Sequence, residues 1–241
     1  MYTPIENNLH LELNHDSSLN TKLPYKQLLV CLMYVSLGTR PDISYSVSYF
    51  GRFQQNPTDG HFYHLLRVLK YLVTTINLKL TFNCNDVELE AYADADWANN
   101  VNDRKSVSGY CFKVYGCLVS WTSKGQSLVA LSTTEAEFIS LCSSCCDLLF
   151  LRNLLKDFGI VLNQPTVVFE DNQSTIRVLM NFENNKRCKH LDVKYHFVFN
   201  LIKEKAIDIK YVCSNNQLVD ILTKGLYRVK FKDFVKRLNL L

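Results

Sequence analysis

The chain has 241 residues, of which 47% are hydrophobic and 12% aromatic, with only 5 prolines and 8 glycines. This composition is typical of a packed protein with one large domain or two smaller ones, and it excludes a disordered, low-complexity or fibrous chain. The formal net charge of +4 conceals an uneven distribution, because residues 186–241 carry 13 Lys or Arg against 5 Asp or Glu, whereas residues 1–185 carry 14 against 18. A basic segment of this kind indicates a polyanionic partner.

The nine cysteines are irregularly spaced, and no charged start followed by an apolar run marks a signal peptide. We therefore expect reduced thiols in an intracellular chain that is not secreted. No apolar run approaches the roughly 20 residues that a membrane-spanning helix needs, so no membrane partner is expected. Cys142, Cys145 and Cys146 have the close spacing of zinc ligands, but no second ligand pair of suitable spacing follows, which favours buried thiols.

The N-terminal third of the chain is predicted to be helical. Residues 1–23 are polar and are expected to form a flexible arm. Apolar residues then recur with helical spacing over 25–38, 42–53 and 59–73. Each stretch has an apolar stripe, so residues 24–86 are expected to form a small helical segment.

The period of the pattern changes near residues 83–86, where we place the domain boundary. Alternating apolar residues predict strands over 87–93, 108–114 and 118–121, with Tyr115-Gly116 as a tight hairpin turn. A long helix over about 132–158 closes at Gly159. We then expect strands at 166–169 and 207–213, and helices from about 172 and 191 and near 217–223 and 229–238. This order predicts a mixed α/β fold with one five-stranded sheet and helices on its faces.

Four acidic residues stand where predicted strands end or predicted helices begin: Asp94, Glu137, Asp171 and Asp220. Strand ends and helix starts collect at one edge of an α/β sheet, so these carboxylates can converge. Converging carboxylates repel one another unless a cation neutralises them, and oxygen-only ligands favour Mg²⁺ or Mn²⁺ over zinc. Two such ions suit in-line displacement at phosphorus. Considered singly, each residue could instead cap a helix or interact with the helix dipole.

The sequences around the four carboxylates form a recognisable set. They are YADADW at 92–97, STTEAEF at 132–138, FEDNQS at 169–174 and NQLVDILTK at 216–224. With DRKSVSGY at 103–110 and KRCKHLDVKYHF at 186–197, they make the chain resemble the ribonuclease H domain of Copia-type long-terminal-repeat retrotransposon Pol polyproteins. TRPD at 39–42 and LKYL at 69–72 extend the resemblance upstream, to the segment that joins the polymerase of these polyproteins to the nuclease.

The resemblance implies a ribonuclease H-like domain over 87–226, preceded by the helical connection segment 24–86 from reverse transcriptase and followed by a C-terminal helix over 227–241. It implies that Asp94, Glu137, Asp171 and Asp220 are the catalytic residues and ligands of two Mg²⁺ ions, for which Mn²⁺ could substitute. Glu137 is preferred to Glu135 because the ligand glutamate of this fold directly precedes a large apolar residue, here Phe138. Asp96 shares a strand face with Asp94 and is expected to have a supporting role.

The activity implied by the resemblance is hydrolysis of the RNA strand of an RNA–DNA hybrid, recognised by backbone shape and 2′-hydroxyl groups. Lys186, Arg187, Lys189 and Lys194 are candidate phosphate contacts, although a solvated helix face would explain them nearly as well. The reverse transcriptase domain would be the partner in the parent polyprotein, and a cytoplasmic retrotransposon particle would be the location.

Two departures from related enzymes leave an alternative open. The Tyr-Xaa-Asp-Asp signature of the polymerase is absent, and so is the histidine that many cellular ribonucleases H place shortly before the last aspartate. The chain could therefore be a catalytically weak or inactive remnant that only binds nucleic acid or protein. A transposase or integrase on the same fold agrees less well with the residues around Asp220. We also expect the helices of residues 24–86 to expose an apolar patch, since their polymerase neighbour is missing.

Overall fold

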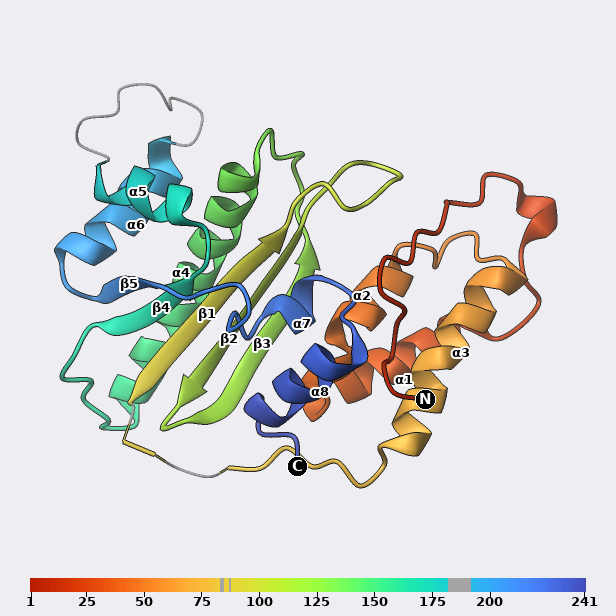
Figure 1. Ribbon diagram of the computed structural model, residues 1–241, viewed down its shortest axis with the longest axis horizontal. Coiled ribbons are helices and arrows are strands. Elements are labelled where there is room, and N and C mark those ends of the chain that lie inside the picture. Colours follow the sequence, from red (N-terminus) through yellow and green to blue (C-terminus); the bar gives the residue numbers. More distant parts are fainter. Residues whose placement is uncertain (83–84, 87, 182–191) are drawn as a thin grey trace.

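A computed structural model describes the chain except for residues 83, 84, 87 and 182–191. Its centre is one mixed five-stranded sheet with the strand order β3-β2-β1-β4-β5 (Figure 1). The strands are β1 (Leu89–Asp96), β2 (Val107–Val114), β3 (Cys117–Gly125), β4 (Thr166–Glu170) and β5 (Ile207–Tyr211). β1, β2 and β3 form an antiparallel meander, and β1, β4 and β5 run parallel. The predicted mixed sheet of a ribonuclease H-like fold is confirmed.

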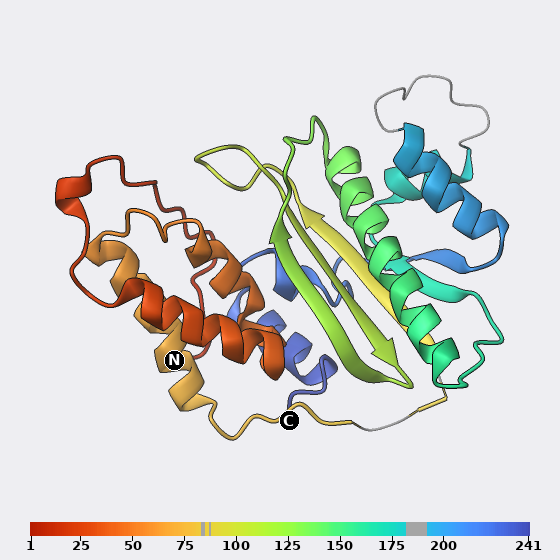
Figure 2. The ribbon, with the colours of Figure 1, turned by 180° about the vertical axis from the view of Figure 1, so that it is seen from behind.

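Helices cover both faces of the sheet. α4 (Thr133–Asp157) packs along β1 and β2, beside α5 (Gln173–Met180) and α6 (Asp192–Lys203). The opposite face carries α7 (Asp220–Thr223) and α8 (Arg228–Arg237), together with the N-terminal helices α1 (Tyr25–Gly38), α2 (Ser44–Gly51) and α3 (Asp59–Thr74) (Figure 2). Side chains alternate between the two faces along each strand, so both faces of the sheet carry apolar residues. In β1, Ala91 and Ala93 pack toward α4, while Tyr92 packs into the core on the opposite face.

Local sequence explains the elements that hold the site. Tyr115 and Gly116 both have positive φ, 49° and 76°, which is the conformation of the tight turn predicted between β2 and β3. At the start of α4 the Ser132 hydroxyl accepts a hydrogen bond from the Glu135 amide at 3.2 Å. The expected helix over 42–53 is divided into a 3₁₀ turn at Pro41–Ile43 and α2.

α4 is long and apolar enough to cross a membrane by length and composition alone, which the sequence-based expectation overlooked. In the structure it packs against β1 and β2, and its buried side chains include Phe138, Leu141, Cys145 and Leu148. Its apolar character is therefore that of a helix in a protein core.

Part of residues 1–23, the segment expected to form a flexible arm, contacts the N-terminal helices. The Tyr49 hydroxyl accepts a hydrogen bond from the Leu11 amide at 2.9 Å and donates one to the Leu9 carbonyl at 3.0 Å. Arg67 donates to the Thr3 carbonyl and forms an ion pair with Glu6 at 2.8 Å. The flexible arm stays a prediction, but these contacts could not be read from local sequence because the partners lie on α2 and α3, far away in the sequence.

The N-terminal helices, α7 and α8 share one hydrophobic core with the second face of the sheet. Phe231 of α8 contacts Tyr71 of α3 edge to face, with ring centroids 5.7 Å apart. The helical segment therefore packs onto the nuclease domain. It also keeps apolar side chains exposed on one face of α1, as expected; these are Val30, Met33, Tyr34 and Leu37.

Candidate active site

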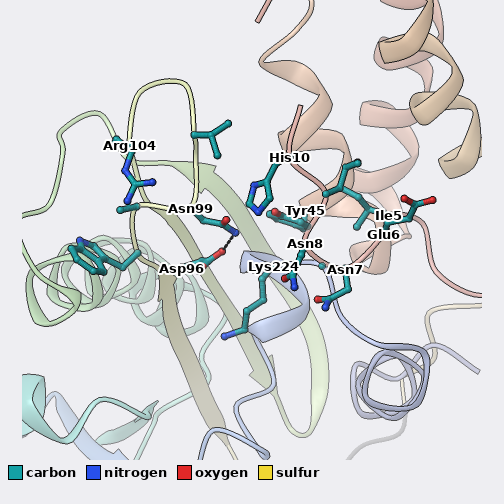
Figure 3. A pocket seen from close by; sticks show the side chains of 15 residues that line it. Ile5, Glu6, Asn7, Asn8, His10, Tyr45, Asp96, Asn99, Arg104 and Lys224 are labelled. Atoms are coloured by element: carbon teal, nitrogen blue, oxygen red, sulfur yellow. Dashed lines mark hydrogen bonds between the residues drawn. The ribbon is translucent and has the colours of Figure 1, made fainter. Parts of the chain in front are cut away.

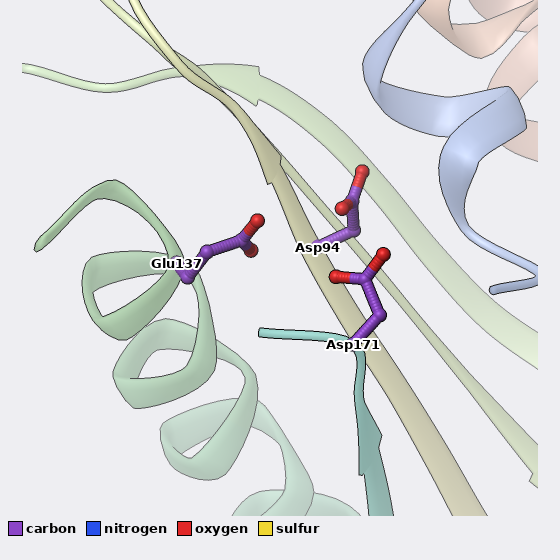
Figure 4. A group of neighbouring side chains, drawn as sticks. All are labelled: Asp94, Glu137 and Asp171. Atoms are coloured by element: carbon purple, nitrogen blue, oxygen red, sulfur yellow. The ribbon is translucent and has the colours of Figure 1, made fainter. Parts of the chain in front are cut away.

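Three carboxylates converge at one edge of the sheet. Asp94 lies in β1, Asp171 directly follows β4, and Glu137 lies in the first turns of α4 (Figure 4). One carboxylate oxygen from each residue lies within 4.8 Å of the other two. They meet because β1 and β4 are parallel neighbours and α4 packs on β1, where the Ser140 hydroxyl donates to the Asp94 carbonyl at 2.8 Å.

Burial makes this group electrostatically unfavourable without a cation. Asp94 is only 2% exposed, and burial, reinforced by the charges of Asp220 and Asp171, raises its pKa to about 7. Burial and the neighbouring carboxylates also hold the pKa of Glu137 well above its usual range. No hydrogen-bond donor in the described part of the chain reaches the buried Oε2 of Glu137. Three converging carboxylates, one of which carries a buried oxygen without a donor, fit a hard divalent cation.

Glu170 is a further buried carboxylate that was not predicted. It is the last residue of β4, it is fully buried, and its Oε1 accepts a hydrogen bond from the Asn172 amide at 3.0 Å. Burial is the main reason that its pKa is held well above the usual range. A signal was present in the sequence, because strand alternation from Val168 places Glu170 on the inward face.

The fourth predicted ligand, Asp220, is buried at the start of α7 but is engaged by two lysines. Its Oδ1 lies 2.7 Å from Lys224 Nζ, and its Oδ2 lies 2.5 Å from Lys230 Nζ. Among the described residues, Asp220 does not belong to the converging group of three. Its role as a metal ligand stays a prediction.

Thr223 and Lys224 connect α7 to the converging group. The Thr223 hydroxyl donates to Asp94 Oδ2 at 2.5 Å, and Lys224 Nζ lies 3.9 Å from the same oxygen. Burial alone would lower the pKa of Lys224, but the charges of Asp94 and Asp220 outweigh it and raise that pKa. Lys224 therefore remains an ammonium ion beside the carboxylates.

Glu135 and Asp96, the acidic residues next to predicted ligands in the sequence, accept hydrogen bonds from nearby groups of the chain. Glu135 Oε2 accepts a hydrogen bond from the Leu131 amide at 2.7 Å, so Glu135 caps α4 while Glu137 points to the site. Asp96 accepts a hydrogen bond from the Asn99 side chain. Asp96 also lines an open cleft of about 470 Å³.

This cleft lies between the N-terminal segment and the loop that follows β1. Figure 3 shows Asp96, Asn99 and Arg104 on one side of it and Asn8 and His10 on the other. Lys224 also lines the cleft, and its ammonium group lies within reach of Asp94. The cleft therefore leads to the edge at which the carboxylates meet.

Among the candidate phosphate contacts, Lys186, Arg187 and Lys189 lie outside the described residues, and Lys194 is half-buried on α6. Of the clustered cysteines, Cys142 and Cys145 are buried as expected, and burial raises the pKa of Cys142 to about 11. Cys146 is exposed, contrary to the expectation. The three carboxylates are the only metal-binding constellation found within the described ranges.

The sheet topology, the covering helices and the acidic group at the sheet edge define a ribonuclease H-like domain. No family model matches the chain. It is 34% identical over 240 residues to the "Retrovirus-related Pol polyprotein from transposon RE2" of Arabidopsis thaliana, and 36% identical over 211 residues to that "from transposon TNT 1-94" of Nicotiana tabacum. The alignments cover 99% and 88% of this chain and 16% of each relative. These relatives are Pol polyproteins of Copia-type transposons, and the chain, similar to them over nearly all of its own residues, spans about a sixth of their length.

Solved structures similar to the chain include LC11-RNase H1 in complex with RNA/DNA hybrid, with a TM-score of 0.44 and 14% sequence identity. That alignment covers 56% of this chain and 94% of the solved one. The foamy viral protease-reverse transcriptase in complex with dsDNA is similar over 59% of this chain, with a TM-score of 0.43 and 15% identity.

Proposed function

We propose that the chain is a divalent-metal-dependent endonuclease that hydrolyses the RNA strand of an RNA–DNA hybrid. The observation that carries this proposal is the convergence of Asp94, Glu137 and Asp171, from three separate elements, within 4.8 Å. The homology to Pol polyproteins supports the same activity. The reverse transcriptase domain as partner and the cytoplasmic retrotransposon particle as location belong to this proposal.

Asp94, Glu137 and Asp171, with Asp220 as the fourth predicted ligand, would hold two divalent ions, which when bound supply a water of lowered pKa and stabilise charge at the phosphate. The protein's own contribution is orientation. The Thr223 hydroxyl donates a hydrogen bond to Asp94 Oδ2. The Ser140 hydroxyl donates to the Asp94 carbonyl, which links β1 to α4, the helix that contains Glu137. These hydrogen bonds hold the carboxylates in place before substrate binds.

The polar cleft beside the site would receive the nucleic-acid backbone. Lys224 and Arg104 line it and are suited to contact phosphate oxygens. The amide side chains of Asn8 and Asn99 also line it, and they offer the donors and acceptors that recognise a 2′-hydroxyl group. Contacts of this kind distinguish RNA from DNA with little reading of the bases.

Cleavage of a labelled hybrid in Mg²⁺ tests the proposal. The wild-type chain should cut the RNA strand of the hybrid but leave a DNA duplex intact. Asp94→Asn and Asp171→Asn should each slow cleavage by at least about 100-fold, because losing a ligand removes several kcal/mol of charge stabilisation. Asp157→Asn, an exposed carboxylate at the end of α4, is the matched control and should cut like the wild type.

The same preparation separates the enzyme from a remnant that only binds. If the wild type and the Asp94→Asn and Asp171→Asn variants cut the hybrid equally, or none of them cuts it, the proposal is wrong. Retarded migration of uncut hybrid in a gel would then identify a nucleic-acid-binding domain.

A further inference from the structure

Asn102, in the loop that follows β1, is tied to the N-terminal segment, residues 3–13. Its Oδ1 accepts a hydrogen bond from the Leu13 amide at 2.9 Å, and its Nδ2 donates to the Leu11 carbonyl at 3.1 Å. On the other side, the Tyr49 hydroxyl of α2 accepts a hydrogen bond from the Leu11 amide at 2.9 Å. The segment is therefore held between the loop at the sheet edge and the N-terminal helices.

The N-terminal segment also passes close to Gly225, the residue after Lys224. A methyl group at Gly225 would lie 2.6 Å from the Glu6 carbonyl oxygen, so only glycine lets the two backbones approach this closely. The Glu6 side chain forms its ion pair with Arg67 of α3 at 2.8 Å. Contacts with the loop, with the helices and with the residue beside Lys224 thus fix the position of the segment.

The cleft of about 470 Å³ between this segment and the loop has left-handed backbone on both walls. Six non-glycine residues in the described ranges have positive φ, and three of them line the cleft: Asn8 at 55°, Ala98 at 50° and Arg104 at 56°. This conformation is tolerated by asparagine but is costly for alanine and arginine. Such residues persist where the surrounding structure holds them, and they cluster at sites that bind ligands.

The side chains along the cleft offer hydrogen-bond donors on both walls. Figure 3 shows Asn8 and His10 of the segment opposite Asn99 and Arg104 of the loop. A nucleic-acid backbone presents phosphate and hydroxyl oxygens to groups of this kind. Lys224, which lines the same cleft, lies 3.9 Å from Asp94 Oδ2, so a strand in the cleft would reach the carboxylates.

The charged residues that line the cleft leave it with little net charge. Glu6 and Lys224 form ion pairs with residues outside the cleft, at 2.8 Å and 2.7 Å. Asp96 and Arg104 carry opposite charges. Binding of a strand therefore depends on hydrogen bonds from the two walls, and such bonds require the walls to be held at the right spacing.

We propose that Asn8 and His10 form one wall of the substrate site and contact the sugar-phosphate backbone of the RNA strand, and that Asn102 is a positioning residue that sets the spacing of this wall from the loop. The inference deepens the proposed function and rests on the cleft assigned to nucleic acid there. It makes the N-terminal segment part of the nuclease site, although the segment lies outside the ribonuclease H-like domain predicted over residues 87–226.

The Kd for a labelled RNA–DNA hybrid, measured by fluorescence anisotropy in a chelator, and the KM and kcat of cleavage in Mg²⁺ test the inference on the full chain. Asn102→Ala should raise Kd and KM at least about fivefold and change kcat less than about twofold, because it displaces the wall but leaves the carboxylates in place. Tyr49→Phe keeps the ring, loses the hydrogen bonds to the same segment and should have the same effect. Asn163→Ala loses a hydrogen bond to Glu88 at the opposite end of β1 and is the matched control, which should bind and cut like the wild type.

Combining variants separates positioning from general damage to the fold. Asn8 and His10 are exposed, so the Asn8→Ala, His10→Ala double variant keeps the inference testable if Asn102→Ala does not fold. The double variant should raise Kd at least about fivefold, and adding Asn102→Ala should weaken binding less than about twofold further, because the wall then carries no contacts to misplace.

Wild-type affinity of the double variant, or effects of Asn102→Ala and the double variant that simply multiply, would overturn the inference. A lower kcat with unchanged KM in Asn102→Ala would overturn it as well. If the wild type binds the hybrid, these variants weaken binding as expected and no hybrid is cut, only the proposed function fails. A wild type that neither binds nor cuts the hybrid would contradict both.

Discussion

Asp94 interacts with the other two carboxylates of the group and with residues of α4 and α7. Its side chain is buried, it faces two further carboxylates, and one of its oxygens receives both the Thr223 hydroxyl and the more distant Lys224 ammonium group. Burial and like charge raise its pKa to about 7, and the lysine opposes this shift only in part. Without a cation, Asp94 is therefore partly protonated near neutral pH, and a bound cation would favour its ionised form.

The metal-free chain should lose stability as the pH rises toward neutrality. An aspartate whose pKa is 3.8 when unfolded and about 7 when folded binds more protons in the folded state between these values. Its contribution is fully present below about pH 4 and is lost as the pH rises through about 7. Thermal unfolding in a chelator from about pH 5 to about pH 8 should show a falling Tm, with a smaller fall in Asp94→Asn. A Tm that rises equally in both proteins would contradict this.

Metal affinity should change with pH in the opposite direction, because the ion competes with protons for Asp94 and Glu137. The Kd for Mn²⁺, measured by calorimetry, should decrease as the pH rises from about 6 to about 8. Proton release should accompany binding near neutral pH and diminish at the upper end of this range. A pH-independent Kd would show that these carboxylates are already ionised.

At the scale of elements, the close contact between β2 and α7 positions the Thr223 hydroxyl. Gly109 of β2 pairs with Asp94 of β1, and α7 lies directly above it. A methyl group at Gly109 would lie 2.6 Å from Thr223 Cγ2 and 3.1 Å from Leu222 Cβ. Glycine is needed here for space, because only a residue without a side chain lets α7 approach the sheet.

Gly109→Ala should therefore destabilise the chain by about 1–3 kcal/mol, the usual cost of overpacking a core. It should also weaken Mn²⁺ binding, since α7 must move and take the Thr223 hydroxyl away from Asp94. Gly125→Ala, at the end of β3, is the matched control, because no heavy atom lies within 4 Å of the added methyl group. Urea unfolding of both variants measures the difference, and equal stabilities would refute the packing argument.

At the scale of the whole molecule, the helix beyond the nuclease domain belongs to the same core as the N-terminal helices and the sheet. α8 places Phe231, Phe234 and Val235 in that core, and an isolated bridge joins Leu80 to Leu240. The same helix carries Lys230 to Asp220. Packing of the N-terminal helices against α8 therefore helps to hold the Lys230 ammonium group beside Asp220.

Phe234→Ala should cost about 3–5 kcal/mol of unfolding free energy, because it leaves a cavity in this shared core. It should also lower the stability of the N-terminal helices, which hydrogen exchange of their amides would report. Phe150→Ala is the control, since Phe150 is 70% exposed on α4 and its loss should change little. Protection lost only in α8 would show that the helix is a separate unit.

Periodicity along the chain was enough to predict most strands and helices, because a repeat of two or of about 3.6 residues follows from backbone geometry and one-sided burial. The same local patterns placed Asp94, Glu137 and Asp171 near strand ends and helix starts, and parallel pairing of β1 with β4 then brings the two aspartates together. Alternation would also have indicated that Glu170 is inward. The motifs indicated the similarity to retrotransposon Pol polyproteins.

The partners of Asp220 and the position of residues 1–13 depended on tertiary structure. Lys230 reaches Asp220 only because α8 packs into the core shared with α3, and the N-terminal segment is held by Tyr49 and Arg67. Local pattern shows which residues are buried or exposed along one element, but an ion pair or hydrogen bond between distant elements depends on how their surfaces pack. The sequence alone thus determined the sheet, the similarity to Pol polyproteins and the convergence of three of the four predicted carboxylates, while packing decided that lysines meet the fourth.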